Sequence, residues 1–244
     1  MKNPKGERAG PPGAGSPAAI VTGSNRGIGP EIVRLLQQGG FSVVSNGRSR
    51  TKGPGDLHVR ADVSTRTGAQ KVVAAARRAF GRLDLLVCGV GDFAYTPIRE
   101  MQLDDWDAIF ESNLRSAWLC CREALPLLRK RGGTIVTIGG PVTQTVRANP
   151  RAVAYAMAKT ALTVFTKSLA QAEARNGIRV NMVNPGFIET YAYTKKELAQ
   201  AAERTPAGRT GRPGDIAGTI AWLASDAASF VNGAVIDVGG GLWV

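Results

Sequence analysis

The chain has 244 residues, of which 43% are hydrophobic and 20% are charged, and its formal net charge is +12. This length can bury a sizeable core, and the apolar share excludes a disordered chain. No apolar run reaches the roughly 18–20 residues that a membrane-spanning helix needs, and the basic N-terminus lacks the apolar region of a secretory signal.

The positive charge leaves three kinds of partner open: nucleic acid, an acidic protein, or a phosphorylated ligand. The basic residues are scattered, and the densest run, at 129–131, has no aromatic residues between its members. We therefore expect most of them to cover solvated faces, and we expect no nucleic-acid or membrane partner. The cysteines, two of which are adjacent, do not suggest a disulfide framework, so we expect a cytoplasmic protein.

Strands and helices are predicted to alternate after a Gly- and Pro-rich segment at 1–17, which we interpret as a flexible tail. Short apolar runs predict strands at 18–21, 41–45, 57–61, 83–88, 134–138, 179–183 and 234–238. Longer segments predict helices at about 30–38, 69–80, 104–130, 152–176 and 215–224. Since no linker divides residues 18–244, we predict a single doubly wound α/β domain with a parallel sheet.

A glycine-rich turn follows the first predicted strand and opens the first predicted helix. Gly23, Gly27 and Gly29 are spaced in it as TGxxxGxG. Such a turn tolerates positive φ and lets the backbone approach a pyrophosphate, while the helix N-terminus offers unpaired N–H groups. In this context the pattern predicts a dinucleotide site rather than a purely structural turn.

Together with Tyr155 and Lys159 in the pattern YxxxK, this turn resembles the short-chain dehydrogenase/reductase family, and within it the 3-oxoacyl-[acyl-carrier-protein] reductase-like ketoreductases. The resemblance extends from about residue 18 to residue 241. Its further marks are Asp62-Val63, Ser112-Asn113-Leu114, Asn184-Pro185-Gly186 and the glycine-rich end at 238–241. It implies a seven-stranded Rossmann-like sheet, a nicotinamide cofactor, and a homotetramer or homodimer.

The cofactor is predicted to be NADP(H). A carboxylate at the end of the second strand would bind the ribose 2′-OH and reject a 2′-phosphate, but residues 45–50 contain none. Arg48 is a bidentate donor suited to phosphate, and we expect Arg26 on the same side; a merely solvated Arg48 is the alternative. The implied cofactor-binding residues are Gly23, Ser24, Asn25, Arg26, Gly27, Ile28, Gly29, Arg48, Ser49, Asp62, Val63, Cys88, Val90, Gly91, Asn113, Tyr155, Lys159, Pro185, Gly186, Ile188 and Thr190.

Three side chains are predicted to be catalytic. Tyr155 and Lys159 are one helical turn apart and share a face. We expect the Lys159 ammonium and the positive nicotinamide to favour the phenolate, whose ordinary pKa is about 10. The resemblance implies that Tyr155 donates a proton to a carbonyl, that Lys159 holds the nicotinamide ribose, and that Asn113 anchors a water of the proton relay.

Two positions depart from the family's pattern. Gly140 stands where the family has a Ser whose hydroxyl binds the substrate carbonyl, and losing one such donor typically costs about 10²–10³ in rate. Thr143, or failing that Thr145, is a candidate substitute. The family's Asn-Asn-Ala-Gly is replaced by Cys88-Gly89-Val90-Gly91, which keeps the final glycine.

Residues 187–212 are predicted to form a substrate lid. Its aromatic and apolar side chains predict a bulky or ring-containing substrate, although aromatics that pack on the protein itself would leave the same pattern. The predicted substrate-contacting residues are Gly140, Val142, Thr143, Phe93, Phe187 and Tyr191, with Tyr95 and Tyr193 close to them. No metal-ligand spacing is present, so no metal site is predicted.

These features favour an NADPH-dependent ketoreductase of specialised metabolism that acts on a bulky or polyketide-like carbonyl. The substrate is either free or attached to a carrier protein, whose acidic surface would meet the basic residues at 129–131 and Arg175. Because Gly140 replaces the family's Ser, non-reductive chemistry with Tyr155 as the acid, as in a cyclase, dehydratase or isomerase, is the main alternative. A non-enzymatic scaffold is a weaker one, since Tyr155, Lys159 and Asn113 are all present.

Overall fold

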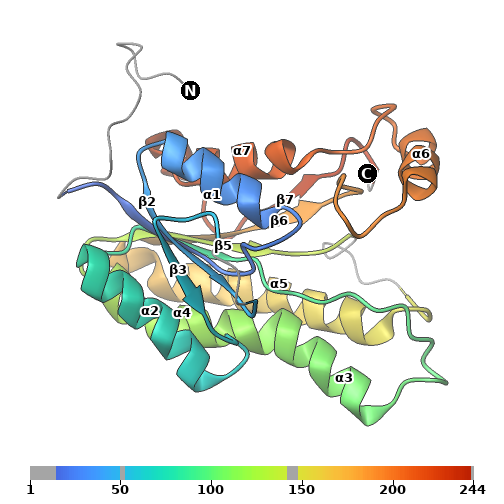
Figure 1. The fold of residues 1–244 in the computed structure, drawn as a ribbon, viewed down its shortest axis with the longest axis horizontal. Helices are drawn as coiled ribbons and strands as arrows, with labels where there is room; N and C mark the ends of the chain where they lie inside the picture. Colours follow the sequence, from blue (N-terminus) through green and yellow to red (C-terminus); the bar gives the residue numbers. More distant parts are fainter. Residues whose placement is uncertain (1–14, 50–52, 142–147, 243–244) are drawn as a thin grey trace.

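The computed structural model describes residues 15–49, 53–141 and 148–242, which form one sheet covered by helices on both faces (Figure 1). The sheet has seven strands in the order β3-β2-β1-β4-β5-β6-β7, and each neighbouring pair is parallel. The predicted doubly wound α/β fold is therefore confirmed. The strands are β1 (Ala18–Val21), β2 (Ser42–Gly47), β3 (Leu57–Arg60), β4 (Leu85–Cys88), β5 (Gly133–Ile138), β6 (Ile178–Pro185) and β7 (Val235–Val238).

Two helical layers enclose the sheet. Helices α1 (Gly29–Gln38) and α7 (Pro213–Leu223) pack together on one face, and α2 (Arg66–Phe80), α4 (Ser116–Leu128) and α5 (Val153–Glu173) cover the other (Figure 1). Successive residues of one strand serve opposite layers: Ile20 belongs to the core under α2 and α4, and Val21 to the core under α1 and α7. This two-sided burial explains why the central strands read as uninterrupted apolar runs.

Two helical segments differ from the sequence-based prediction. The single helix predicted at 104–130 consists of α3 (Leu103–Phe110), a π-helical turn at Glu111–Arg115, and α4. The predicted lid contains a further helix, α6 (Lys195–Arg204), which begins with a reciprocal capping box between Thr194 and Glu197. Periodicity missed α6 because Ala201 is its one fully buried residue. It missed the π turn because the backbone is helical on both sides of Glu111–Arg115 and the segment contains no Gly or Pro.

The folded contacts begin slightly before the predicted domain start. Of the segment 1–17, residues 15–17 are described, and the Pro17 carbonyl accepts a hydrogen bond of 2.8 Å from the Ser42 N–H. The Gly15 carbonyl accepts one of 2.8 Å from Arg82. Within the described part of the chain, no helix combines the length and apolar character needed to cross a membrane.

The strand order reverses between β1 and β4, which are neighbours at the centre of the sheet. In such sheets, ligands bind in the crevice beyond the carboxyl ends of the strands at this reversal. Thr22 joins the two ends: its N–H donates to the Val87 carbonyl at 3.0 Å, and its hydroxyl accepts from the Gly89 N–H at 3.0 Å. The motifs that follow β1 and β4 therefore open onto the same crevice.

Candidate active site and cofactor crevice

The glycine turn between β1 and α1 depends on the absence of side chains. Gly23 and Gly27 have φ of +67° and +63°, in the left-handed region that favours glycine. A Cβ on Gly23 would lie 2.6 Å from the Gly89 carbonyl oxygen, and one on Gly29 would lie 2.5 Å from the Gly23 oxygen. The turn is thus pressed against the end of β4 and folded on itself, with the free N–H groups of the α1 N-terminus beside it.

The side chain of Ser24 makes hydrogen bonds within the described part of the protein, whereas the side-chain amide of Asn25 makes none there. The Ser24 hydroxyl donates to the Asn46 carbonyl at 3.1 Å and accepts from the Asn46 N–H at 2.9 Å, which ties the turn to β2. Both polar atoms of the Asn25 amide are buried with no hydrogen-bond partner among the described residues. A buried, unpaired amide is costly, so Asn25 suits a polar ligand at the turn, whereas the Ser24 side chain is already engaged.

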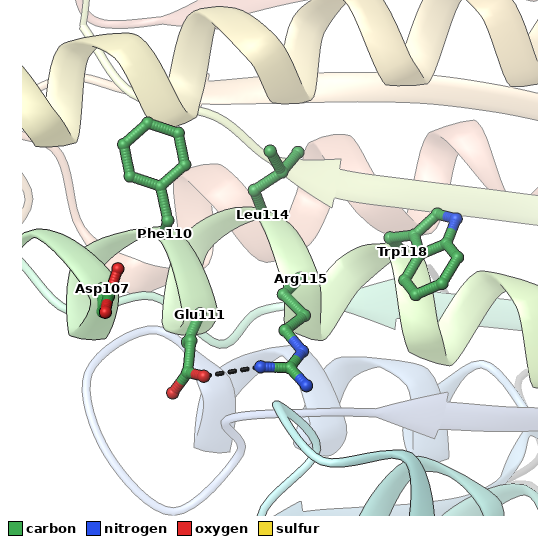
Figure 2. A pocket seen from close by; sticks show the side chains of 6 residues that line it. All are labelled: Asp107, Phe110, Glu111, Leu114, Arg115 and Trp118. Atoms are coloured by element: carbon green, nitrogen blue, oxygen red, sulfur yellow. Dashed lines mark hydrogen bonds and ion pairs between the residues drawn. The ribbon is translucent and has the colours of Figure 1, made fainter.

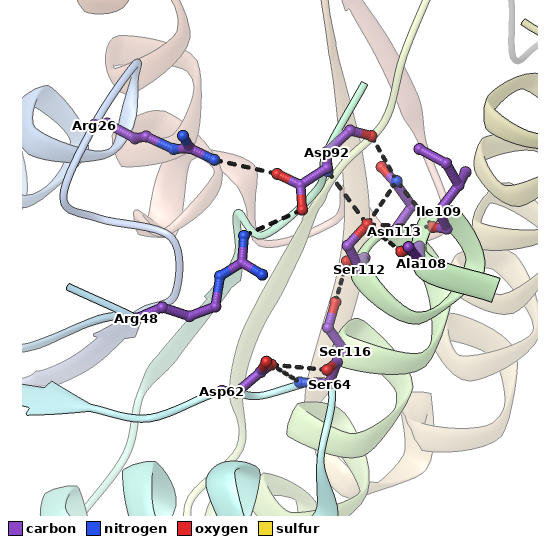
Figure 3. Close-up of polar contacts among 10 residues, drawn as sticks. All are labelled: Arg26, Arg48, Asp62, Ser64, Asp92, Ala108, Ile109, Ser112, Asn113 and Ser116. Atoms are coloured by element: carbon purple, nitrogen blue, oxygen red, sulfur yellow. Dashed lines mark hydrogen bonds and ion pairs between the residues drawn. The ribbon is translucent and has the colours of Figure 1, made fainter. Parts of the chain in front are cut away.

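Arg26 and Arg48 come from different elements and meet on one carboxylate (Figure 3). Arg26 lies in the glycine turn and Arg48 follows β2. Their guanidinium groups approach the two Asp92 carboxylate oxygens at 3.1 and 3.3 Å. Tyr191 of the lid lies under Arg26, with 5.3 Å between the guanidinium carbon and the ring centroid. The two arginines therefore face the same space, as expected from the sequence, but Asp92 was not among the predicted site residues.

Asp62, predicted to bind the adenine end of the cofactor, is held by its neighbour Ser64. One Asp62 oxygen accepts from both the N–H and the hydroxyl of Ser64, at 2.9 and 2.7 Å. Burial alone would raise the pKa of Asp62, but the Ser64 hydrogen bonds and the Arg48 charge outweigh it, and the pKa is lowered. Its neighbour Val63, also predicted to bind cofactor, has its side chain in the hydrophobic core.

Tyr155 and Lys159 project from the first half of α5 toward the end of β5. The Lys159 ammonium donates to the Ile138 carbonyl at 2.7 Å and lies 5.8 Å from the Tyr155 ring centroid. Burial lowers the pKa of Lys159 to about 8. Burial raises the pKa of Tyr155 above its ordinary value, and the neighbouring Tyr193 and Tyr95 raise it further. Without a cofactor, desolvation of the phenol dominates the Tyr155 pKa, and the predicted effect of the Lys159 ammonium together with a bound nicotinamide stays a prediction.

Asn113 lies in the π-helical turn, which holds its amide at the crevice (Figure 3). Its Nδ2 donates to the carbonyls of Asp92 and Ile109 at 2.8 and 3.0 Å. Its Oδ1 is buried and has no partner in the described part of the chain. A Cβ on Gly91 would lie 2.5 Å from this oxygen and 3.2 Å from the Lys159 ammonium. Gly91 thus leaves room beside a ready acceptor and a cation.

Gly140 faces the Tyr155 hydroxyl directly. A Cβ at Gly140 would lie 2.8 Å from the Tyr155 oxygen and 3.3 Å from Cγ of Lys159. The tyrosine oxygen thus occupies space that any side chain at position 140 would enter. Val142, Thr143 and Thr145, predicted as substrate contacts or substitutes for Ser, lie outside the described residues.

Aromatic rings surround Tyr155. Phe93 packs edge-on against both Tyr155 and Tyr95, with centroids 4.8 and 4.5 Å apart, and Tyr193 packs edge-on against Phe187. Phe93 and Tyr95 are 52% and 73% exposed, so the rim presents ring faces to a ligand. The rings come from the loop after β4 and from the lid after β6, two segments that the sequence also predicted to meet at the substrate.

The remaining predicted cofactor residues occupy varied places. Cys88 is buried in the core with its sulfur 3.9 Å from that of Cys121, Ile188 is buried under α7, and Val90 packs at the core's edge. Ser49 follows Arg48, and Gly186 pairs with Val238 through its N–H at 3.0 Å. Pro185 is the last residue of β6, and Ile28 directly precedes α1. The Thr190 hydroxyl accepts a hydrogen bond of 3.4 Å from the Ala192 N–H. Cys88 and Ile188 are each 4% exposed, so their side chains offer almost no surface to a cofactor.

Comparisons with known proteins agree with one another. A family model described as enoyl-(acyl carrier protein) reductase matches residues 23–243. An uncharacterized oxidoreductase of Methylorubrum extorquens is 36% identical over 92% of this chain and 96% of its own. The 3-oxoacyl-[acyl-carrier-protein] reductase FabG of Escherichia coli is 34% identical over 93% of this chain and 97% of its own. The ligand-free aldohexose dehydrogenase of Thermoplasma acidophilum has a TM-score of 0.85 at 27% identity, over 93% of this chain and 94% of its own.

Proposed function

The chain belongs to the short-chain dehydrogenase/reductase family and is an NAD(P)-dependent oxidoreductase, and we propose that it uses NADPH to reduce the ketone of a bulky, ring-containing substrate. The observation on which this rests most heavily is the gathering of Tyr155, Lys159 and the unpaired Asn113 oxygen around the side-chain-free positions Gly91 and Gly140. Relatives named as ketoacyl reductases support the reaction class.

The crevice fits a dinucleotide on its own chemistry. Buried and unpartnered polar atoms of Asn25 and Asn113 stand at its two ends, and the glycine turn leaves the N-terminus of α1 open to phosphate. Arg26 and Arg48 would hold a 2′-phosphate, and Asp62 the adenine edge. Lys159 and Tyr155 would border the nicotinamide ribose, and the bound nicotinamide supplies the hydride.

The protein's own contribution to the reaction is proton transfer and orientation. Tyr155 donates its phenolic proton to the carbonyl oxygen, and its raised pKa keeps that proton on the oxygen until charge develops on the substrate. Lys159, with a pKa of about 8, is able to exchange a proton near neutral pH and return it toward Tyr155. The Asn113 Oδ1 accepts a hydrogen bond from the water that connects this pair to solvent.

The aromatic rim supports a ring-containing substrate. Phe93 packs edge-on against Tyr155 and Tyr95, and Tyr193 packs edge-on against Phe187. Rings of this kind would pack favourably against a flat ring of a ligand. A carrier-bound substrate is supported by the names of the relatives rather than by charge. Of the basic residues at 129–131, Arg129 is already paired with Glu173 at 2.9 Å, which leaves less charge for an acidic carrier.

The reductase is tested by following NADPH absorbance with aromatic and aliphatic ketones, each supplied free and as a carrier-protein thioester. We expect NADPH to be oxidised faster with ring-containing ketones than with aliphatic ones. Tight NADPH binding without oxidation by any ketone would instead support non-reductive chemistry, which Gly140 favours because this position carries no hydroxyl for the substrate carbonyl.

The cofactor preference has its own test. Arg48→Gln removes one guanidinium from the phosphate site, so NADPH should bind roughly 10- to 100-fold more weakly, with NADH little changed. Arg78→Gln on the exposed face of α2 makes the same charge change far from the crevice and should leave both cofactors unaffected. Equal NADPH and NADH affinity in the unaltered protein would contradict the proposed preference.

A homo-oligomer is proposed from an apolar hollow on the face of α3, the π turn and α4 (Figure 2). The hollow measures about 510 Å³ and is lined by Asp107, Phe110, Glu111, Leu114, Arg115 and Trp118. Trp118 is 43% exposed, and Val164 on the neighbouring α5 is 62% exposed. Exposed apolar side chains on neighbouring helices suit a self-complementary interface. Light scattering should give a dimer or tetramer that Trp118→Lys weakens.

A further inference from the structure

We propose that Asp92 is an internal anion that occupies the phosphate-recognising arginines and that a 2′-phosphate must displace it. Asp92 thereby sets how strongly the protein distinguishes NADPH from NADH. This inference rests on the proposed use of NADPH. It concerns a residue outside the predicted cofactor set, and its effect is a matter of affinity rather than of catalysis.

The first argument is convergence. Three separate segments meet at the Asp92 carboxylate: the glycine turn through Arg26, the end of β2 through Arg48, and the loop after β4 that carries Asp92 itself (Figure 3). The carboxylate oxygens lie 3.1 and 3.3 Å from the two guanidinium groups, one oxygen for each. Two cations from different segments that share one anion define a small anion site, and Asp92 fills it.

The second argument is that the Asp92 backbone is held in place. Its carbonyl accepts from Nδ2 of Asn113 at 2.8 Å, and its N–H donates to the Ser112 hydroxyl at 3.4 Å. Both partners belong to the π-helical turn. The carboxylate is therefore presented toward the arginines from a backbone fixed by hydrogen bonds, while the side chain itself stays free to rotate away.

The third argument is that the two ion pairs of Asp92 are exposed to solvent and individually weak. The side chains of Arg26, Arg48 and Asp92 are 59%, 61% and 40% exposed, so the ion pairs are open to a competing solute. Exposed ion pairs are individually weak, and a phosphate dianion offers more oxygens and more charge than one carboxylate. A 2′-phosphate is thus able to displace Asp92, but its net affinity is reduced by the two ion pairs that are broken.

The test uses Asp92→Asn in the full chain with 2′,5′-ADP and 5′-ADP as probes, measured by calorimetry, and with NADPH and NADH measured by nicotinamide fluorescence. Removing the carboxylate should increase the affinities for 2′,5′-ADP and NADPH by roughly 2- to 30-fold, which corresponds to the strength of two exposed ion pairs. The 5′-ADP and NADH affinities should change less than twofold, roughly, because those ligands do not compete with Asp92.

Two control variants separate this effect from simpler ones. Glu100→Gln makes the same charge change on an exposed residue of the same loop, and it should leave all four affinities unchanged. In a background where Arg26 and Arg48 are both Gln, Asp92→Asn should give no gain in 2′,5′-ADP affinity. Thermal melting of each variant checks that the fold is retained.

Four results would overturn the inference. In Asp92→Asn, they are unchanged or weaker 2′,5′-ADP binding and weaker NADH binding. In the control variants, they are an equal gain in 2′,5′-ADP affinity from Glu100→Gln, and a gain from Asp92→Asn that persists when Arg26 and Arg48 are both Gln. If the unaltered protein shows no preference for 2′,5′-ADP over 5′-ADP, the proposed cofactor fails and this inference fails with it. A preference that depends on the arginines but not on Asp92 leaves the proposed function intact.

Discussion

The proposed phosphate end and the proposed catalytic end of the crevice both depend on a missing side chain, but for different reasons. At Gly29, an added Cβ would lie 2.5 Å from backbone atoms of the same turn. At Gly140, it would lie 2.8 Å from the Tyr155 hydroxyl, the tip of a side chain. The first glycine is required by the fold of the turn, whereas the second changes the space around a reacting group. The phosphate end is therefore determined by backbone geometry, and the catalytic end by the positions of a few side-chain atoms.

The largest effect is expected at the catalytic end. Tyr155→Phe removes the proposed proton donor, and ketone reduction should fall by about 10²–10⁴-fold. NADPH affinity should stay within about threefold, because the phosphate end is untouched. Stopped-flow turnover and cofactor fluorescence measure the two quantities separately. Full activity in the phenylalanine variant would show that the proton comes from another group.

A pair of substitutions at Gly140 sharpens the comparison. Gly140→Ala introduces a methyl group that must push the Tyr155 oxygen aside without supplying a donor, so kcat should fall. Gly140→Ser causes the same displacement but adds a hydroxyl that is able to bind the substrate carbonyl. The serine variant should therefore exceed the alanine variant in kcat by up to about 10²-fold. Equal activity of the two variants would mean that no carbonyl donor is needed at this position.

At the phosphate end the expected loss is one of stability and cofactor binding together. In Gly29→Ala the new methyl group meets backbone that has no free rotation to relieve the contact, so the free energy of unfolding should fall by about 1–3 kcal/mol. Urea denaturation measures this change. Gly218→Ala is the matched control: it lies inside α7, no atom lies within 4 Å of its added Cβ, and better helix propensity should raise stability slightly. Unchanged stability and NADPH affinity in Gly29→Ala would contradict the importance of this turn.

The same contrast explains what could be predicted from the sequence. Uninterrupted apolar runs located the strands along the chain, because two-sided burial demands such runs, and the glycine spacing marked the turn between β1 and α1. The π turn around Asn113 was not predictable, since no Gly or Pro marks it and the backbone is helical on both sides of it. Nor were the Asp92 ion pairs, which join segments far apart in sequence, although an acid directly after Gly91 was a signal available for them. The raised pKa of Tyr155 depends on packing by Phe93, Tyr95 and Tyr193, which spacing alone does not reveal.

The smallest expected effect concerns the pH dependence that Lys159 imposes. Burial lowers its pKa from 10.5 to about 8, so between these values the unfolded chain binds a proton that the folded chain does not. The Lys159 contribution to the free energy of unfolding should therefore rise with pH, by about 2 kcal/mol between about pH 7 and pH 9.5. Buried Cys88 and Cys120, whose pKa values are raised, act in the opposite direction over the same range, as does Tyr155 at higher pH.

A difference measurement removes these opposing groups. Cys120 and the phenol are common to the unaltered protein and to Lys159→Met, so their effects largely cancel in the difference in unfolding free energy, which reports Lys159 together with its coupling to Cys88. The unfolding free energy of the unaltered protein should rise by about 2 kcal/mol relative to that of Lys159→Met as the pH rises from about 7 to 9.5. A difference that stays constant across this range would mean that Lys159 keeps its ordinary pKa. In that case Lys159 would hold its proton well above neutral pH, and the proposed exchange of its proton with Tyr155 would lose its support.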